Sequence, residues 1–229
     1  MEKKYILLVS ALCFSFILHA QSRKNKSFSK EEKIEKEEKI NTKVEKVPLN
    51  LRISNSAIGA VKFSDNYEEL LKKFGKINIL DDELPSSPES DHTEIKTIIN
   101  IGEETEVIIS WDTKAFHKKI SAIEVNQPEF PFITKEGISY GTTLEELEVI
   151  NGAPISFYSF GQSLGGTITN LNNGKLEKNS GIKTLYELSI DGIMDEDISG
   201  VETLKSDESK IGKYRNKIYV SKITLIIGK

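Results

Sequence analysis

The chain has 229 residues, with 31 Lys+Arg against 35 Asp+Glu, three His and one Cys, and a formal net charge of −4. Subtracting +1 for residues 1–20 and +3 for Arg23–Lys46 leaves −8 on the remainder, Val47–Lys229. An acidic region of this size repels a phosphate backbone, which disfavours nucleic-acid binding.

Residues 1–20 are typical of a signal peptide. A basic start, Met1–Lys4, precedes an apolar run 14 residues long, Tyr5–Leu18, and Ala20 offers a cleavage point. The apolar run is shorter than the roughly 20 residues that span a bilayer. We therefore expect an extracytoplasmic (periplasmic or secreted) protein that begins near Gln21, with no transmembrane segment in the mature chain. A retained N-terminal anchor remains an alternative.

The only cysteine, Cys13, lies inside this apolar run. Cleavage near Ala20 would leave no thiol for disulfides, thiolate zinc sites or a cysteine nucleophile. Lipidation of Cys13 would require a small residue directly before it, and Leu12 occupies that place.

Residues 21–47 form a charged segment. Arg23–Lys46 contains nine Lys/Arg and six Glu, too polar a composition to offset the entropy of ordering. Its few apolar residues do not make a heptad repeat. We expect a flexible tail, with a coiled-coil, membrane-surface or spacer role as the alternatives.

The remainder contains a weak internal duplication. Residues 64–75 and 142–152 share Glu-Glu-Leu followed five residues later by Gly, and each predicts one short helix. Capping boxes are expected at Asp65 with Glu68 and at Thr143 with Glu146. Left-handed C-caps are expected at Gly75 and Gly152.

Segments of strand character follow each predicted helix. They are Lys76–Leu80, Glu94–Ile101, Thr105–Trp111 and Ile120–Val125, then Pro154–Phe160, Gly166–Leu171, Thr184–Ile190 and Lys217–Ile227. The closing segments match again, since Ile120–Val125 and Val220–Leu225 both read aliphatic-Ser-x-Ile-x-aliphatic. Asp191–Lys213 is polar and is expected to be a long exposed excursion.

These segments predict an α+β fold of two similar modules, residues 51–130 and 131–229, each with a short helix packed on an antiparallel β-sheet. A parallel sheet would need crossover helices, for which the strand-rich stretch 94–125 has no room.

Gly141-Thr-Thr-Leu-Glu-Glu-Leu147 with Gly152-Ala-Pro154 resembles the helix start of SmpA/OmlA/BamE-like envelope modules. A tandem pair of such modules is similar to beta-lactamase-inhibitor proteins. The second copy also resembles uncharacterised exported bacterial proteins through Phe160-Gly161 and Gly165-Gly166, although Gln162, Ser163 and Leu164 replace the aromatic residues expected between them. The likeness covers 138–171 well and 58–125 faintly. It implies binding of a protein or surface without catalysis.

Gly161-Gln-Ser163-Leu-Gly165 fits the G-x-S-x-G nucleophile elbow of serine hydrolases. That motif needs a helix after the turn and a histidine later in the chain. The following residues are poor helix formers, and no histidine follows His117. A hydrolase that uses Ser163 is therefore the enzyme alternative to a non-catalytic protein, and a tight β-turn is the expected role of these glycines.

No metal site or cofactor is expected. His92 and His117 lack a second ligand at metal-site spacing. The acidic clusters Asp81–Glu83 and Asp195–Asp197 are read as loops and do not match a calcium loop.

The expected function is an exported, non-catalytic binding or interaction protein of the cell envelope or secreted space, with an unknown protein or envelope component as partner. An antiparallel sheet with helices on one face leaves the other face for a partner. Aromatic residues are enriched at interfaces. Tyr140, Tyr158 and Phe160 are therefore the predicted partner-binding residues, although all three could equally be core.

Overall fold

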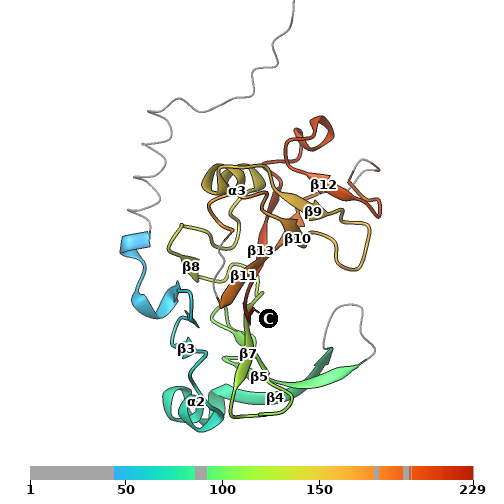
Figure 1. Cartoon of the computed structure of the whole chain (residues 1–229). Coiled ribbons are helices and arrows are strands. Elements are labelled where there is room, and N and C mark those ends of the chain that lie inside the picture. Colours follow the sequence, from blue (N-terminus) through green and yellow to red (C-terminus); the bar gives the residue numbers. More distant parts are fainter. Residues whose placement is uncertain (1–43, 86–91, 178–180, 193–195, 197, 229) are drawn as a thin grey trace, which may run out of the picture.

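The computed structural model describes residues 44–85, 92–177, 181–192, 196 and 198–228. The predicted signal peptide and the tail before Val44 lie outside the described residues. The fold is α+β, with helices α2 and α3, a helical stretch at residues 44–46 and mostly antiparallel sheets in the described part of the chain (Figure 1).

The largest sheet has six strands in the order β11-β13-β7-β6-β5-β4 and is antiparallel throughout. Its strands alternate buried β-branched and half-exposed residues, as a sheet with one covered face requires. In chain order they are β4 (Ile79–Pro85), β5 (Thr93–Ile99), β6 (Val107–Trp111), β7 (Ile120–Val125), β11 (Ile182–Ile190) and β13 (Ile218–Ile227).

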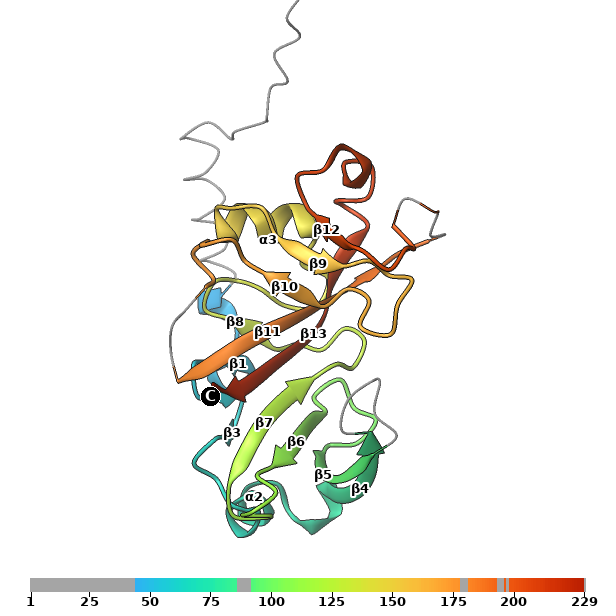
Figure 2. The ribbon, with the colours of Figure 1, turned by 45° about the vertical axis from the view of Figure 1, so that its right-hand side comes forward.

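The two closing strands, β7 and β13, pair with each other and join the two predicted modules into this one sheet (Figure 2). Glu124 lies opposite Thr224, with Ile123 opposite Leu225 and Val125 opposite Ile223. The pairing is thus symmetric about Glu124 and Thr224, which are equivalent positions in the sequence match. The division into two similar modules stays a prediction.

A three-stranded sheet, β10-β9-β12, continues the six-stranded one. It comprises β9 (Ser156–Tyr158), β10 (Ile168–Asn170) and β12 (Thr203–Lys205). The junction is a single bridge between Thr167 and Glu187, beside a hydrogen bond from the Leu188 N–H to the Gly166 carbonyl oxygen (2.9 Å).

A small four-stranded sheet, β3-β2-β1-β8, contains strands from both predicted modules. Its strands are β1 (Arg52–Ile53), β2 (Ala57–Ile58), β3 (Val61–Lys62) and β8 (Ile133–Thr134), and short 3₁₀ turns occur at η1 (Leu49–Leu51), η2 (Lys76–Asn78) and η3 (Ser209–Ile211). The β1–β8 pair is parallel, an exception to the expected antiparallel pairing.

Both predicted helices form. Helix α3 (Leu144–Asn151) has the expected capping box of Thr143 and Glu146, and Gly152 is left-handed. Helix α2 (Tyr67–Phe74) is capped by Asn66 with Glu69 rather than by Asp65 with Glu68. The Asp65 carboxylate instead accepts the Lys62 N–H (2.8 Å) and pairs with the Lys73 ammonium (2.6 Å).

Four further expectations were wrong. Gly75 ends α2 with φ 78° but ψ 151°, so it is not a left-handed cap. Residues 76–78 are a 3₁₀ turn, and the acidic residues Asp81–Glu83 lie in strand β4 rather than in a loop. The polar stretch 191–213 is not wholly exposed, because it contains β12 and buries Ile198, Leu204 and Ile211.

One hydrophobic core joins the sheet to both helices. Leu70 of α2 and Leu144 of α3 are fully buried, together with Ile109, Ile123 and Ile223 of the sheet. Because side chains alternate along a strand, the residues between these face the other side of the sheet.

Candidate functional site

The six-stranded sheet has one face that is opposite the core, which we call the open face. It is a candidate binding surface. The strand registers place one residue of each strand in a row: Leu80, Ile98, Ile108, Glu124, Thr224 and Leu185. Leu80 and Leu185, at the two ends, are 44% and 42% exposed, whereas Ile98 is buried. The row spans about 24 Å, from the spacing of neighbouring strands.

Charged side chains flank this row. The Lys222 ammonium pairs with the Glu187 carboxylate at 2.5 Å, and Lys96 lies 3.5 Å from Glu94. The Thr224 hydroxyl lies 3.3 Å from the Glu124 carboxylate in the middle of the row. The open face thus combines apolar residues with paired charges of both signs.

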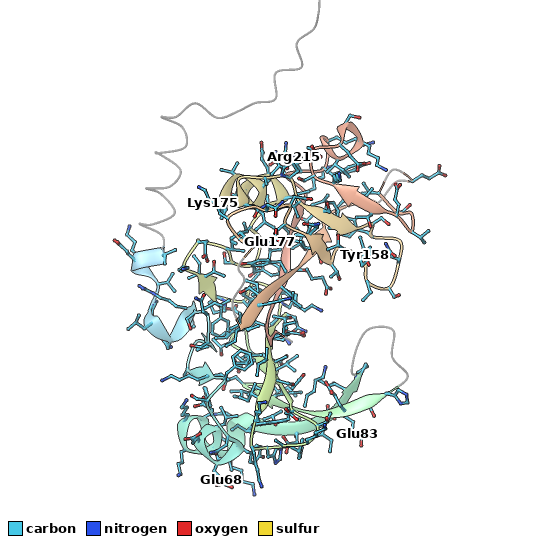
Figure 3. All side chains as sticks on the ribbon, in the orientation of Figure 1. Glu68, Glu83, Tyr158, Lys175, Glu177 and Arg215 are labelled. Carbon is cyan, nitrogen blue, oxygen red and sulfur yellow. The ribbon has the colours of Figure 1, made fainter. Side chains whose placement is uncertain are left out.

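Tyr158 lies on the same side of the sheet. It pairs with Thr203, and its N–H donates to the carbonyl oxygen of Thr167 (3.0 Å). Thr167 is bridged in turn to Glu187 of the open face. Phe157, its neighbour in β9, is fully buried, so alternation turns the half-exposed Tyr158 ring outward (Figure 3).

Tyr140 and Phe160 are also half-buried, and both pack on the core. The Tyr140 ring meets Phe130 and Tyr219 edge-on, with centroids 5.7 and 5.5 Å apart. Phe160 lies 5.9 Å from the buried Phe157 ring. Of the three predicted residues, Tyr158 has the placement that a partner-binding residue needs, and the role of all three stays a prediction.

Ser163 lies in a turn between two strands. β9 precedes this turn, and β10 follows it directly. A nucleophile elbow requires a helix at that point, so the geometry of a serine hydrolase is not formed. A Cβ on Gly161 would lie 1.5 Å from the Ser199 carbonyl oxygen, which shows that this glycine permits a close backbone approach.

His117 is the centre of an aromatic cluster on the core side of the sheet. Its ring stacks on Tyr67 and on Phe116, with ring centroids 4.0 and 3.9 Å apart, and meets Trp111 edge to face at a centroid distance of 5.3 Å. His117 Nε2 lies 3.1 Å from Asp81 Oδ2.

A series of hydrogen bonds next to this cluster links strands β6, β5 and β4. The Trp111 indole N–H donates to the Thr97 hydroxyl (2.8 Å), which donates to Asp81 Oδ1 (2.6 Å). Burial, followed by the nearby Asp81 charge and its hydrogen bond, raises the pKa of Tyr67. These contacts fix α2, the sheet and the loop 112–119 to one another, so we assign His117 a structural role.

No group of three or more His, Cys, Asp or Glu residues that could hold a metal ion occurs within the described ranges. Asp81 is engaged with Thr97 and His117, and Asp82 accepts the N–H of Glu83 (2.9 Å). None of the described helices has the length and apolarity to cross a membrane.

The sequence reasoning missed Leu80 and Leu185 as surface residues. Each is an apolar residue at an outward position of a strand, so strand periodicity could have marked them once the register was known.

Comparison with known protein families, curated proteins and solved structures finds no match to this chain.

Proposed function

We propose that this chain is an exported, non-catalytic binding protein that holds a protein partner on the open face of its sheet. The observation that carries the proposal is the row from Leu80 to Leu185, which crosses all six strands on the face opposite the core. A row of about 24 Å matches the width of a standard protein interface, roughly 800 Å² per partner.

The chemistry of this face favours a folded protein over a small molecule. Apolar residues at both ends would be covered on binding, and paired charges such as Lys222 with Glu187 would form a polar rim. Tyr158 adds an aromatic residue of the kind enriched at binding hot spots. The partner would therefore present apolar side chains to the two ends of the row and polar groups to its middle, with charges of both signs around them.

Two further points support this function. The pairing of β7 with β13 is symmetric about equivalent residues, as a tandem duplication would produce. The resemblance to paired envelope modules, which bind proteins without catalysis, would fit such a duplication.

Photo-crosslinking from both ends of the row tests the proposal. A photoreactive residue placed at Leu80 or at Leu185 should crosslink the same partner in the native compartment, because only a macromolecule reaches both positions. Matched positions at Ile77 and Val201, which are 93% and 83% exposed, serve as controls. Different partners at Leu80 and Leu185, or equal yields at the control positions, would contradict the open face as the binding surface.

Export is tested separately by N-terminal sequencing of the native protein. We expect a start near Gln21 in an extracytoplasmic fraction, since the basic start and apolar run resemble a cleaved signal peptide. An intact Met1 in a cytosolic fraction would refute export.

A further inference from the structure

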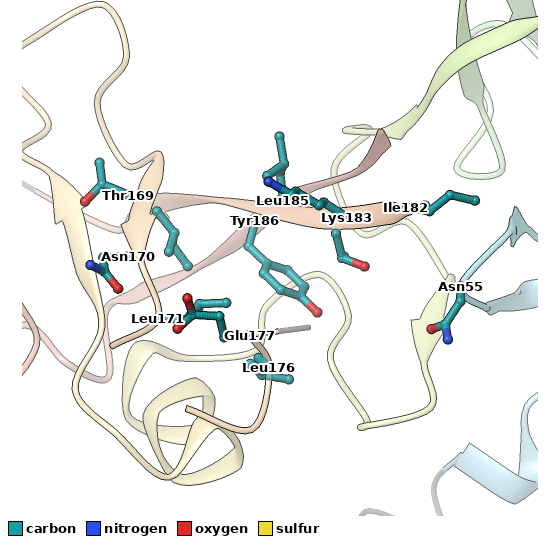
Figure 4. Close-up of a pocket in the computed structure, with 12 residues that line it drawn as sticks. Asn55, Thr169, Asn170, Leu171, Leu176, Glu177, Ile182, Lys183, Leu185 and Tyr186 are labelled. Atoms are coloured by element: carbon teal, nitrogen blue, oxygen red, sulfur yellow. The ribbon is translucent and has the colours of Figure 1, made fainter. Parts of the chain in front are cut away.

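Strands β10 and β11 are joined at one point and then diverge. The single bridge between Thr167 and Glu187 connects them. A pocket of about 300 Å³ lies in the gap beyond this bridge (Figure 4). Two runs of consecutive residues form most of its wall, 168–171 from β10 and the start of the following loop, and 182–186 from β11. Because side chains alternate between the two faces of a sheet, consecutive residues of a strand line one pocket along the strand edge, where the backbone is exposed.

The edge of β11 that faces this pocket carries backbone groups without a partner. The Gly228 N–H donates to the Gly181 carbonyl oxygen (2.8 Å), which directs the backbone groups of Gly181 toward β13. These groups alternate in direction along an antiparallel strand, so those of Lys183 and Leu185 also point to β13 and those of Thr184 point away from it. No hydrogen bond from the β10 side reaches the Thr184 N–H or carbonyl oxygen in the described part of the chain. The pocket therefore contains an unpaired backbone donor and an unpaired backbone acceptor.

The opposite edge of the same sheet, strand β4, is protected against further pairing. It carries the exposed side chains of Asp82 and Glu83, the Asp82 carboxylate accepts the Glu83 N–H (2.9 Å), and Pro85 has no N–H. Charged residues and proline are the usual means by which an edge strand avoids pairing with another strand. On β11 no side chain accepts the Thr184 N–H in the described residues, and the neighbouring Lys183 points to the open face (Figure 4). Of the two edges of this sheet, β11 is therefore the one that can accept a further strand.

A strand in this gap would meet apolar side chains on both of its faces. The Tyr186 ring points from β11 toward the loop, and Leu171 and Leu176 of the loop line the same side (Figure 4). Leu185, at the border of the open face, lies on the other side. Because side chains alternate along a strand, successive residues of an added segment would contact these two groups in turn. β-Branched residues such as valine, isoleucine and threonine suit both positions.

We propose that an extended segment of a partner protein adds as a strand between β10 and β11. A carbonyl oxygen of this segment accepts the Thr184 N–H, and an N–H of the segment donates to the Thr184 carbonyl oxygen, as in other cases of strand addition. A second copy of the chain fits less well. Its one other edge strand longer than three residues, among those described, is β4, whose acidic residues 81–83 would lie beside Glu177 of the pocket.

Amide hydrogen exchange of the full chain tests the backbone pairing. The probe is an acetylated and amidated pentapeptide of alternating valine and threonine. At saturating peptide the exchange of the Thr184 amide should slow about tenfold or more, because its N–H gains a partner. The Leu185 amide is the internal control, since it is already bonded to β13 and should exchange at an unchanged rate. The same peptide with an N-methylated backbone keeps every side chain but has no backbone N–H, so it should bind about tenfold more weakly or worse.

Two substitutions at one position assign the contact. Thr184→Pro removes the N–H that faces the pocket and keeps the β11–β13 hydrogen bonds, because Thr184 points away from β13. It should weaken binding of the pentapeptide about tenfold. Thr184→Val is the matched control, since it keeps the N–H and changes only the side chain, and it should leave the affinity nearly unchanged. A retained thermal midpoint of Thr184→Pro separates a lost contact from unfolding.

The proposal is overturned if the pentapeptide leaves the exchange of the Thr184 amide unchanged in the wild-type chain, or if the N-methylated peptide binds as tightly as the unmodified one. Both comparisons use the wild-type chain, so they decide the question even where Thr184→Pro fails to fold. Sedimentation of the chain alone tests the other occupant, because a dimer with a protected Thr184 amide would assign the site to a second copy and overturn the partner segment. The inference does not rest on the open face: Leu80 lies at the far end of the sheet, so failure here leaves crosslinking from Leu80 unaffected.

Discussion

Two glycines with similar backbone angles have very different surroundings. Gly166 (φ 83°) lies at the junction of the two sheets, where a Cβ would be 1.9 Å from the Leu188 carbonyl oxygen. Gly102 (φ 77°) has no atom within 4 Å of the same position. The backbone angle is therefore unfavourable for a side chain at both sites, but a steric clash exists only at Gly166.

Substitution of each glycine by alanine separates the two effects. Gly102→Ala should lower the free energy of unfolding by about 1 kcal/mol, the cost of a positive φ. Gly166→Ala should lower it by about 3 kcal/mol or more, because the clash also forces β10 away from β11. Urea denaturation followed by Trp111 fluorescence measures both. Equal losses would show that the close approach at Leu188 is unimportant.

The pair formed by Tyr219, at the start of β13, and Tyr140 predicts a pH dependence. A hydrogen bond with Tyr140, followed by burial, raises the pKa of Tyr219 to about 12 from an ordinary value of 10. Because the folded pKa lies above the unfolded one, this contribution to stability is fully present below pH 10 and is lost as the pH rises through 12.

Tyr140→Phe should therefore move the titration of Tyr219 down toward pH 10, since the largest cause of the shift is removed. NMR of ring-labelled tyrosine follows this titration directly. The stability of the variant should also fall less than that of the wild type between pH 10 and 12, where the contribution of Tyr219 is lost. Tyr158→Phe is the control and should leave the Tyr219 titration in place. An unchanged Tyr219 titration in Tyr140→Phe would show that the Tyr140 hydroxyl is not its partner.

At the scale of elements, the sequence predicted correctly the helices and strands whose sequence patterns lie within one short segment. The second helix was placed correctly because Thr143, Glu146 and Gly152 carry the whole cap within one segment. Strand β7 was predicted with its observed ends, Ile120–Val125, since its aliphatic pattern is unbroken. At the first helix the cap was misplaced by one residue, because Lys62 and Lys73, outside the capping motif, engage Asp65.

Features that depend on distant pairing were not predictable in the same way. β1 consists of two residues, and its parallel pairing joins Arg52 to Ile133, far apart in sequence. β12 was hidden in a polar stretch, where Leu204 is the single buried residue of three. β10 and β11 diverge after the single bridge between Thr167 and Glu187, and the cavity of about 300 Å³ between them depends on this distant pairing (Figure 4). Tyr158 could be named from the sequence, but only the register places it with the open face.

The segment after β12 is tied to α3 by a small polar network. The Glu148 carboxylate pairs with Arg215 at 2.8 Å through one oxygen and accepts the Ser206 hydroxyl through the other. Ser206 also accepts the N–H of Ile155 (2.9 Å). One glutamate thus connects the helix, the segment after β12 and the start of β9.

Glu148→Ala should lower the free energy of unfolding by about 2 kcal/mol, since the buried Ser206 hydroxyl loses its acceptor and the half-buried Arg215 loses its ion pair. Lys119→Ala provides the contrast, because the Lys119–Asp112 pair is solvent-exposed and should contribute less than about 1 kcal/mol. Chemical denaturation of the two variants gives both values. A Glu148 effect no larger than that of Lys119 would mean that the segment is held by its apolar residues alone.

At the scale of the whole molecule, the central feature is that the sheet runs without interruption through both predicted modules. β7 of the first and β13 of the second are adjacent strands near its middle. The core is likewise continuous from Leu70 to Leu144. If the halves were separate folding units, their interface would resemble a transient contact between domains, but here it is a backbone ladder of paired residues.

The two halves should therefore unfold together. Trp111, the single tryptophan, reports on residues 51–130 through its fluorescence, and the methyl NMR signal of Leu188 reports on residues 131–229. Because exposing either half would break the β7–β13 pairing and open the shared core, both signals should change at one urea concentration with one slope, as a two-state transition requires. Ile223→Ala, at the junction, should move both midpoints down equally by removing a fully buried side chain. Two separate midpoints in the wild-type chain would instead show that the boundary near residue 130 divides independent domains, and that the open face is assembled from parts that fold alone.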